Sequence, residues 1–531
     1  MQHRQLVVVV ALCTIAAACT GGTIDSNPPS TSGPAVATSI DLPVPPGATV
    51  AIALDEPEAL SAHHALSSAA LDVASLLHTG LTRRNETGIA EPALAANWTT
   101  LDQRTWTFNL NQELRFNDGT PITAQSFVDS WQALATQETR ARNAYLGLTA
   151  GISGWGEVLS GEEGRVIGAV AIDDLSLQIQ LNDPFPWLAE LLAHPAFAPV
   201  AASELANPDV FAPVGTGPFR IAEQWDPGEV LQLARVWGGD GSGSVSNFQI
   251  HFSQSSRHAA ELIENGVVEL AVIGDAFAPT GVDILEVPTD TLIYLGFPVT
   301  RPPTDEPGIR QGLVHAIDRE RIRDQIIGNT SILTDTYAPE HAAGATLLLC
   351  TRCVYDPDTA RELLAEIEPP QNSLSLHVVE DTPGELWADA IATLWQDELG
   401  WPVAVVRHSL PSLIGFLQAG VPDGPFILEW TSEYTGAESW FTHLFDRAGL
   451  EDFTRFSDRN INRSVAALAA MPATSPNRTS HLKDIREVLA ERVPTIPLAV
   501  TARRVAIAEG IDGDSLWSGA HLGLDYLVWL P

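Results

Sequence analysis

Residue types that could perform chemistry are few and scattered in this sequence. Cys350 and Cys353 form a Cys-x-x-Cys pair, but zinc requires four ligands, and no second cysteine pair or nearby histidine pair completes a site. His63 and His64 are adjacent, and neighbours in sequence rarely share one metal ion. Lys483 is the only lysine, and no glycine-rich phosphate loop precedes it. No His-Glu-x-x-His or Gly-x-Ser-x-Gly motif occurs, so we expect a protein that is not an enzyme and that holds no metal and no cofactor.

The charge of the chain excludes several partners. The 531 residues contain 29 Lys and Arg against 66 Asp and Glu, which gives a formal net charge of −37. A chain this acidic repels phosphate, which argues against nucleic acid as a partner and against docking on anionic lipid through a basic face. At about 150 residues per domain, the length predicts roughly three domains.

The first 46 residues have the pattern of an export segment. Residues 6–18 are almost entirely apolar, in a run too short to span a membrane. Ala16–Cys19 resembles the lipobox of bacterial lipoproteins, in which the cysteine is lipidated and becomes the first mature residue. We therefore expect a lipoprotein signal peptide at 1–18, a flexible tether at 19–46, and an extracytoplasmic protein anchored to the bacterial cell membrane by lipidated Cys19. An ordinary secretory signal, with Cys19 incidental, is the alternative.

Export also affects the interpretation of the cysteine pair. Cys13 and Cys19 both fall in the first 46 residues, the export segment, which leaves Cys350 and Cys353 in the body of the protein. Outside the cytoplasm, two cysteines this close in sequence favour a local disulfide across a surface loop. Two free thiols are the alternative.

Periodicity in the sequence predicts alternating strands and helices. Residues 48–54 and 105–110 have the alternation of strands. Residues 69–80 are helical in pattern, with Gly80 in the place of a C-terminal capping glycine, and a second helix is expected at about residues 124–136. Because strands and helices alternate to the end of the chain, we expect the α/β fold class with mixed sheets.

Six blocks of residues occur in one order along most of the chain. They are Pro92–Ala95 with Trp98, Trp106–Trp131, Pro213–Phe219, Arg310–Arg319, Tyr355–Leu364 and Arg478–Leu498. The second block is similar to the pattern TWTFxLRxGVKFHDGTPLTAxDVxxSW, and the third is similar to PVGTGPY. Together the blocks resemble the peptide/nickel family (family 5) of extracytoplasmic solute-binding proteins of ABC importers, the oligopeptide- and dipeptide-binding type.

The resemblance implies a two-lobed periplasmic-binding-protein-like fold with a hinge and an extra insert domain. Lobe I would consist of residues 47–82, 195–290 and 497–531. The insert domain (domain II) would consist of residues 83–194, and lobe II (domain III) of residues 291–496. The chain would cross between the lobes more than once, and the ligand would be buried when the lobes close.

The resemblance also implies partners and a function. Members of the family capture a peptide or another small solute and deliver it to an ABC permease and ATPase complex. We therefore expect a monomeric substrate-binding lipoprotein of an importer, held at the membrane by its lipid anchor. The alternatives are the same fold binding a metal chelate, an opine or a sugar, or an envelope lipoprotein that has lost transport.

The predicted ligand site follows from the same resemblance. Residues 426–434 are similar to the cleft-lining strand xxxxgWxaDYxDP, whose first Asp pairs with the α-ammonium of the ligand in peptide-binding relatives. Glu433 holds that position, Ser432 and Tyr434 flank it, and Trp430 matches the tryptophan of the motif. A carboxylate that faces an ammonium makes a strong charge-assisted contact, so we expect these four residues to bind the ligand.

Two further residues complete the predicted site. Tyr294 begins a segment, 294–298, that resembles the strand crossing into the second lobe. Ser61 occupies the place of an early cleft-facing segment and replaces its usual Asp. We expect both side chains to face the ligand.

Overall fold

The fold is described from a computed structural model of the chain. It describes residues 48–85, 88–136, 142–162, 164–206, 211–236, 245–274, 277–328, 331–340, 342–370, 372–420, 422–432, 434–440, 444, 452–516 and 522–529. The predicted signal peptide, the predicted tether and Cys19 lie outside the described residues.

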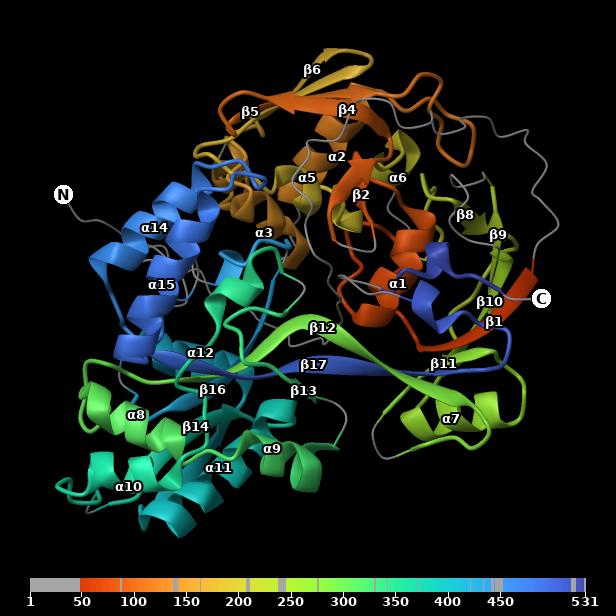
Figure 1. The fold of residues 1–531 in the computed structure, drawn as a ribbon. Helices are drawn as coiled ribbons and strands as arrows, with labels where there is room; N and C mark the ends of the chain where they lie inside the picture. The colour runs from red at the N-terminus through yellow and green to blue at the C-terminus, as the bar shows by residue number, and fades with distance from the viewer. Residues whose placement is uncertain are drawn as a thin grey trace.

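One large mixed sheet runs through the described part of the molecule (Figure 1). Its strands in spatial order are β15 (Val403–His408), β14 (Leu374–Val379), β16 (Phe426–Thr431), β12 (Asp283–Gly296), β17 (Thr495–Ile507), β11 (Leu270–Ile273), β1 (Ala48–Asp55), β10 (Val245–Ser253), β9 (Leu231–Arg235) and β8 (Phe219–Ile221), and β13 (Ser331–Leu333) pairs with β17 off this path. β1 runs parallel to β10 and β11, and β14 runs parallel to β15 and β16, whereas β12 and β17 are antiparallel. The expected α/β class with mixed sheets is confirmed.

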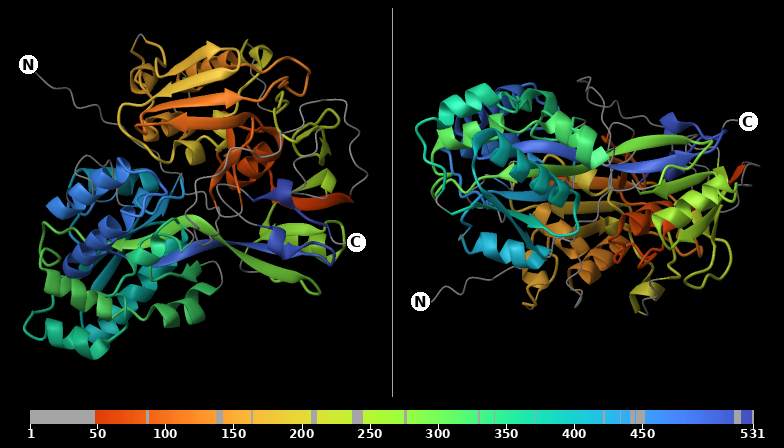
Figure 2. Two further views of the ribbon diagram at one scale, coloured as in Figure 1. Left: turned by 45° about the horizontal axis from the view of Figure 1, so that its top comes forward. Right: turned by 90° about the horizontal axis from the view of Figure 1, so that it is seen from below.

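A separate antiparallel sheet lies beside the large one and is seen at the top of Figure 1 and of the left view of Figure 2. It has the order β4 (Ala95–Thr100), β5 (Thr105–Leu110), β7 (Ser176–Gln180) and β6 (Ala169–Asp173). The helices of this region are α2 (Ala124–Thr136), α3 (Arg142–Thr149), α4 (Trp155–Leu159) and α5 (Leu188–Leu191). A short hairpin of β2 (Thr82–Arg84) and β3 (Ala90–Pro92) leads into it.

The other helices pack on the two ends of the large sheet (Figure 2). On the side of β1 and β10 they are α1 (Ser68–Leu77) and α7 (Ser256–Glu264), whereas α6 (Ala202–Ala206) contacts α2 beside the smaller sheet. On the side of β14 and β16 they are α8 (Pro307–His315), α9 (Arg319–Ile322), α10 (Pro357–Leu364), α11 (Pro383–Leu399), α12 (Leu410–Gln418), α14 (Arg459–Ala469) and α15 (Arg478–Arg492).

Most of the predicted elements are confirmed, with one exception at a helix end. β1 and α2 match the predicted ranges, and β5 buries every second side chain as its alternation requires. α1 ends at Leu77, because His78 is extended, so Gly80 is not a capping residue and that prediction is wrong. Gly80 instead allows a close approach of the chain, since a Cβ there would come within 2.6 Å of the carbonyl oxygen of Leu192.

Three large clusters of buried apolar side chains form the core. One lies within residues 81–201, and a second within residues 292–500. The third combines side chains from residues 50–77, 219–287 and 505–527, which are far apart in sequence. The predicted domain boundaries themselves remain a prediction.

β12 and β17 are the long strands that connect the two ends of the large sheet. They pair along most of their lengths, from Asp283 opposite Ile507 to Gly296 opposite Thr495. The ladder is irregular after Pro288, where β12 has three residues between paired positions and β17 has one, Thr501. A proline lacks the N–H that a ladder needs, and a bulge at this point bends and twists the strand.

A buried ion pair anchors β17 to α1. Both guanidinium NH groups of Arg503 donate to the carboxylate of Asp72, at 3.0 and 2.6 Å. Asp72 also accepts from the backbone N–H of Leu522 at 2.7 Å. The charges are compensated in the core by good geometry, so breaking the pair would leave an uncompensated buried charge.

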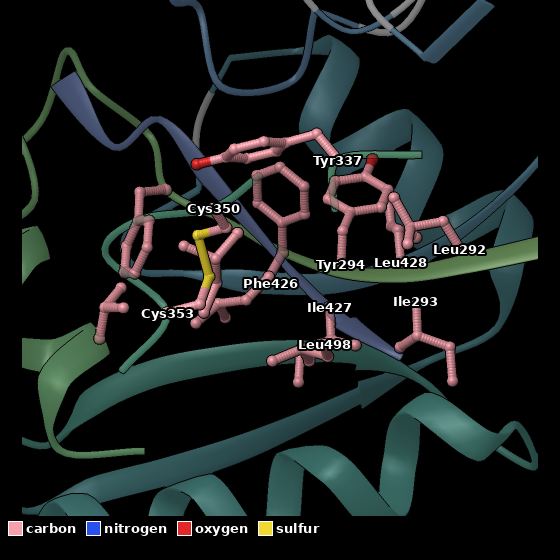
Figure 3. Close-up of a cluster of buried hydrophobic side chains, with 14 of the residues drawn as sticks. Leu292, Ile293, Tyr294, Tyr337, Cys350, Cys353, Phe426, Ile427, Leu428 and Leu498 are labelled. Carbon is pink, nitrogen blue, oxygen red and sulfur yellow. A yellow bond between two sulfur atoms is a disulfide. The ribbon is translucent and has the colours of Figure 1, made fainter. Parts of the chain in front are cut away.

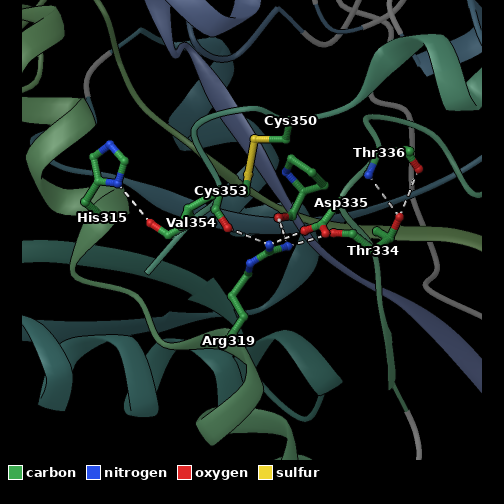
Figure 4. A network of polar contacts seen from close by, with 9 residues as sticks. His315, Arg319, Thr334, Asp335, Thr336, Cys350, Cys353 and Val354 are labelled. Carbon is green, nitrogen blue, oxygen red and sulfur yellow. Dashed lines mark hydrogen bonds and ion pairs between the residues drawn. A yellow bond between two sulfur atoms is a disulfide. The ribbon is translucent and has the colours of Figure 1, made fainter. Parts of the chain in front are cut away.

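Arg319 organises the loop that contains the cysteine pair (Figure 4). Its guanidinium donates to the carbonyl oxygens of Thr334 and Cys353, both at 2.7 Å, and forms an ion pair with Asp335. In this loop Cys350 and Cys353 form a disulfide. The loop is thereby fixed to the first turn of α9 beside the large sheet.

Candidate functional site

β16 lies between two strands, but one of them, β14, pairs with only part of it. On one side it pairs with β12 from Phe426 to Thr431. On the other side its pairing with β14 ends at Ile427, because β14 ends at Val379. The edge of β16 beyond Ile427 is therefore open on the β14 side within the described part of the chain.

Two backbone bonds show which groups face this open edge. The N–H of His377 on β14 donates to the carbonyl of Pro425 at 2.9 Å, and the N–H of Ser432 donates to the carbonyl of Asp290 on β12 at 3.1 Å. Backbone groups alternate in direction along a strand. The N–H and C=O groups of Glu429 and Thr431 consequently point away from β12, toward the open edge.

A pocket adjoins this edge at the carboxyl ends of the parallel strands β14 and β16. The apolar side chains that line it are Val379, Leu410, Ile414, Ile427, Leu428 and Phe453. Tyr294, Thr382, Gly384 and Glu429 complete its wall. Leu410 and Thr382 lie at the beginnings of α12 and α11, so both helices start at the pocket. The carboxyl ends of strands are where open α/β sheets bind ligands.

The structure places the predicted residue Tyr294 in this pocket. β12 and β16 bring Tyr294 opposite Leu428. Figure 3 shows these two side chains close together on one face of the sheet, with Ile293 and Ile427 on the other face. Trp430, two residues beyond Leu428, is partly buried and packs against the apolar cluster of residues 292–500. Their ligand-binding roles remain predictions.

Ser432 and Tyr434 hold the chain that leaves β16. The Ser432 hydroxyl donates to the Tyr434 carbonyl and bonds the Ser439 hydroxyl, both at 2.6 Å. The Tyr434 ring is buried against Phe185, at 5.0 Å between ring centres, and against Trp187, at 6.2 Å. The Ser432 bonds hold the turn after β16, and the Tyr434 ring packs that turn against the segment that follows β7. The ligand-binding roles of both residues stay predictions.

Glu433 lies outside the described residues, although its sequence neighbours Ser432 and Tyr434 are described. Its predicted role as the partner of a ligand ammonium is not tested by the structure. It therefore stays a prediction.

Ser61 lies elsewhere, and it is not among the residues that line the pocket. Its hydroxyl forms a hydrogen bond of 2.8 Å with Nδ1 of His64, in a turn after β1. Burial lowers the pKa of His63 to about 3 and that of His78 to about 4, so both are neutral at physiological pH. The structure does not bring Ser61 together with Tyr294.

A buried polar group that the sequence did not reveal supports the segment after β16. The carboxylate of Glu438 accepts from the indole N–H of Trp187 at 2.6 Å and forms an ion pair with Arg478. The Arg478 guanidinium lies 5.5 Å from the Trp187 ring centre. Gly436 is required here, because a Cβ would come within 2.4 Å of the Trp187 ring.

Glu429 is the functional candidate that sequence reasoning missed. Its carboxylate accepts a long hydrogen bond of 3.3 Å from the backbone N–H of Gly384 at the beginning of α11. Burial raises the pKa of Glu429 to about 7, since the apolar wall disfavours the charged form. The available signal was one acid within the otherwise apolar run Phe426–Trp430.

Metal sites and membrane-spanning helices are absent from the described residues. No cluster of three or more His, Cys, Asp or Glu side chains there is arranged to bind a metal ion. In the same part of the chain, no helix combines the length and apolar character needed to cross a bilayer.

The pair β12 and β17 links two parts of one sheet, and the open edge of β16 adjoins a pocket. This arrangement is typical of a protein that binds a solute. The family model of the bacterial extracellular solute-binding proteins, family 5 (middle region), matches residues 90–406, which is more than half of the chain. The chain belongs to this family. Its members bind solutes for ABC transporters outside the cytoplasm and are not enzymes.

Individual relatives agree with the family. The chain is 24% identical over 475 residues to the periplasmic murein peptide-binding protein MppA of Escherichia coli, covering 84% of this chain and 86% of that one. It is 24% identical over 402 residues to the periplasmic oligopeptide-binding protein OppA of the same organism, covering 70% and 73%. The unliganded open form of the murein tripeptide-binding protein MppA superimposes with a TM-score of 0.77 at 22% identity, over 91% of this chain and 98% of that one. This likeness establishes a periplasmic-binding-protein fold.

Glu429 generates a prediction about pH. Its pKa is about 7 in the folded protein and 4.5 ordinarily, so the folded protein keeps a proton that the unfolded chain loses between these values. The stabilisation from this proton is fully present below pH 4.5 and is lost as the pH rises through about 7. Glu429→Gln stays neutral at every pH. We therefore expect the free energy of unfolding of this variant, relative to that of wild type, to be higher at about pH 8 than at about pH 5. Urea unfolding midpoints of both proteins measure this. An equal difference at the two pH values would mean that Glu429 ionises as an exposed carboxyl does.

Proposed function

We propose that this chain is the peptide-binding component of an ABC importer and delivers its ligand to a membrane permease and its ATPase. Membership of the family supports a solute-binding role. The relatives with the broadest coverage are named for binding murein peptide and oligopeptides, which supports peptides as the ligand class. Closure of the predicted lobes about β12 and β17 would then bury the bound peptide.

The open edge of β16 is the observation that carries this proposal. Backbone groups of Glu429 and Thr431 point toward that edge, where an extended peptide can pair with them as an added strand. Main-chain hydrogen bonds supply affinity that does not depend on the ligand's sequence, and adjacent pockets supply preference for particular side chains. A peptide importer requires that combination, whereas a sugar or an opine offers no regular series of amide groups.

Thr431 allows a direct test of strand pairing. Thr431→Pro removes the N–H that faces the open edge, and Thr431→Val removes the hydroxyl that bonds Thr291 at 2.7 Å but keeps the N–H. We expect Thr431→Pro to weaken the binding of short peptides about tenfold, as the loss of a hydrogen bond of about 1.4 kcal/mol requires. We expect Thr431→Val to bind nearly as wild type. Isothermal titration calorimetry measures both affinities, and circular dichroism checks the fold.

Changes to the amide groups of the peptide supply the control. In a series of peptides, each carries one N-methyl group on a different amide. Methylation of at least one of these amides should weaken binding. The matched peptides carry the additional methyl group on the side chain, as α-aminobutyrate in place of alanine, and should bind as the parent does. If every N-methylated peptide binds as tightly as its parent, main-chain pairing is excluded.

Glu433 is proposed to pair with the α-ammonium of the peptide. The support is its place in the family motif, between Ser432 and Tyr434. Loss of one partner of a buried charge pair costs about 2–5 kcal/mol, so Glu433→Ala should weaken binding by roughly 30-fold to several thousand-fold. Glu433→Gln should also weaken binding, and Glu433→Asp should have the mildest effect. Calorimetry with free and N-acetylated forms of one peptide measures this.

The acetylated peptide distinguishes the anchor from a general effect of the substitution. It should bind wild type poorly and lose little more in Glu433→Ala, because the ammonium is already absent. Equal affinity of free and acetylated peptides for wild type would remove the amino-terminal anchor and favour a chelate or sugar as ligand.

Cys19 is proposed to carry the lipid anchor. The support is the short apolar run that ends in Ala16–Cys19. We expect Cys19→Ser to prevent lipidation and release the protein from the membrane fraction, and Cys13→Ser to leave it attached. Cell fractionation with radiolabelled fatty acid measures both outcomes. A Cys19→Ser protein that is still cleaved and still attached would show that another feature holds it at the membrane.

A further inference from the structure

The pocket beside β16 has walls suited to an aliphatic chain. Six of its lining residues are apolar, and they come from β14, α12, β16 and Phe453. The pairing of β14 with β16 ends at Ile427, and Ile427, Leu428 and Glu429 all line the pocket. A ligand side chain that leaves a main chain paired along this edge would enter the pocket directly.

Glu429, on the same face of β16 as Ile427, places one acid in the wall of this pocket without a basic partner among the residues that line it. None of the ten described residues that line the pocket is Lys, Arg or His, and Tyr294 is the only other ionisable side chain among them. The single hydrogen bond from Gly384 is long, at 3.3 Å. A carboxylate in such surroundings either stays protonated or requires a cation.

The basic side chains on β14, on β15 and beside Phe453 are already engaged. His377 on β14 bonds Asp423 at 2.8 Å and His408 on β15 at 3.0 Å. Arg407 on β15 pairs with Glu385 at 2.5 Å and with Asp389 at 2.7 Å, both on α11. Arg455 lies two residues after Phe453. It donates to the carbonyl oxygens of Leu417 and Gln418, at 3.3 and 2.7 Å. Neither of these arginines neutralises Glu429.

We propose that this pocket selects a ligand group with an aliphatic stem and a cationic head, with Glu429 as its counter-charge. The inference rests on the proposed function, since the ligand's main chain would be held by β16. The stem contacts the apolar walls, and the ammonium or guanidinium head forms a charge-assisted hydrogen bond with the carboxylate. The net charge of −37 raises the local concentration of cationic ligands around the protein. The protein thereby prefers peptides with a basic side chain at one position.

Peptides that differ only in the cationic head test this proposal. Tripeptides of alanine carry lysine, norleucine or glutamate at the first, second or third position, and norleucine has the stem of lysine without its ammonium. We expect lysine to bind at least about tenfold more tightly than norleucine at one position, and glutamate to bind least tightly. In Glu429→Gln the preference for lysine should disappear. Calorimetry at about pH 8, where Glu429 is ionised, measures these affinities.

A matched variant controls for the general effect of charge. Glu362 is an exposed acid on α10, on the same side of the large sheet. Glu362→Gln removes one negative charge outside the pocket and should keep the preference for lysine. If it loses the preference as Glu429→Gln does, the selection comes from the overall field and the cation pocket is overturned.

The remaining outcomes separate this inference from the proposed function. Peptides that bind wild type equally well with lysine and norleucine at every position overturn the cation pocket and leave peptide binding intact. A lysine preference that persists in Glu429→Gln overturns it as well. If no peptide binds, the proposed function fails, and a pair of small probes, pentylammonium and 1-pentanol, decides the pocket alone. Pentylammonium should raise the melting temperature of wild type more than 1-pentanol does and should lose this advantage in Glu429→Gln; no difference between the probes overturns the proposal.

Discussion

The antiparallel pairing of β12 with β17 is the interaction on which the rest of the structure depends. Both strands are buried along most of their lengths, and they join the cores that contain β1 and β16 into one sheet. The irregularity after Pro288 lies between these cores, and threonine hydroxyls fill it: Thr289 bonds Thr501, and Thr291 bonds Thr431. The two ends of the sheet are thus held by one ladder whose longer interruption lies after Pro288, where bending costs little, and a second register shift follows between Ile293 and Tyr294.

The position of the pocket follows from that arrangement. β16 is held against β12 as far as Thr431, but β14 ends at Val379, so one edge of β16 is left open beside the beginnings of α11 and α12. A parallel strand can only return to the sheet through a crossover, and the two crossover helices start at this edge. Backbone groups and apolar side chains are therefore available together at one place, with Glu429 among them.

Buried polar contacts fix the segments around this place. Arg84 at the end of β2 and Asp290 on β12 form an ion pair of 3.9 Å, and Glu438 joins Arg478 to Trp187. Each connects parts of the chain that are about 40 to 250 residues apart. Such pairs contribute little net stability over apolar packing, but they penalise any arrangement that would leave one charge alone. The Glu438 contacts therefore restrict how the segment after β16 docks. The packing of Tyr434 against Phe185 alone would restrict it less.

The sequence by itself determined the α/β class, the family, and local elements such as β1, β5 and α2, because periodicity and short motifs depend on residues close together in the chain. It also directed attention to the strand that contains Trp430. Only the tertiary structure decided which residues share a surface. Ser61 bonds His64 after β1, and Tyr434 is buried against Phe185 and Trp187, while the ligand-binding roles of both residues stay predictions. Glu429 became a candidate only when β14, α11 and α12 came to lie beside it, since the burial that raises its pKa is produced by residues that lie from about 15 to about 135 positions away in sequence, which no local pattern records.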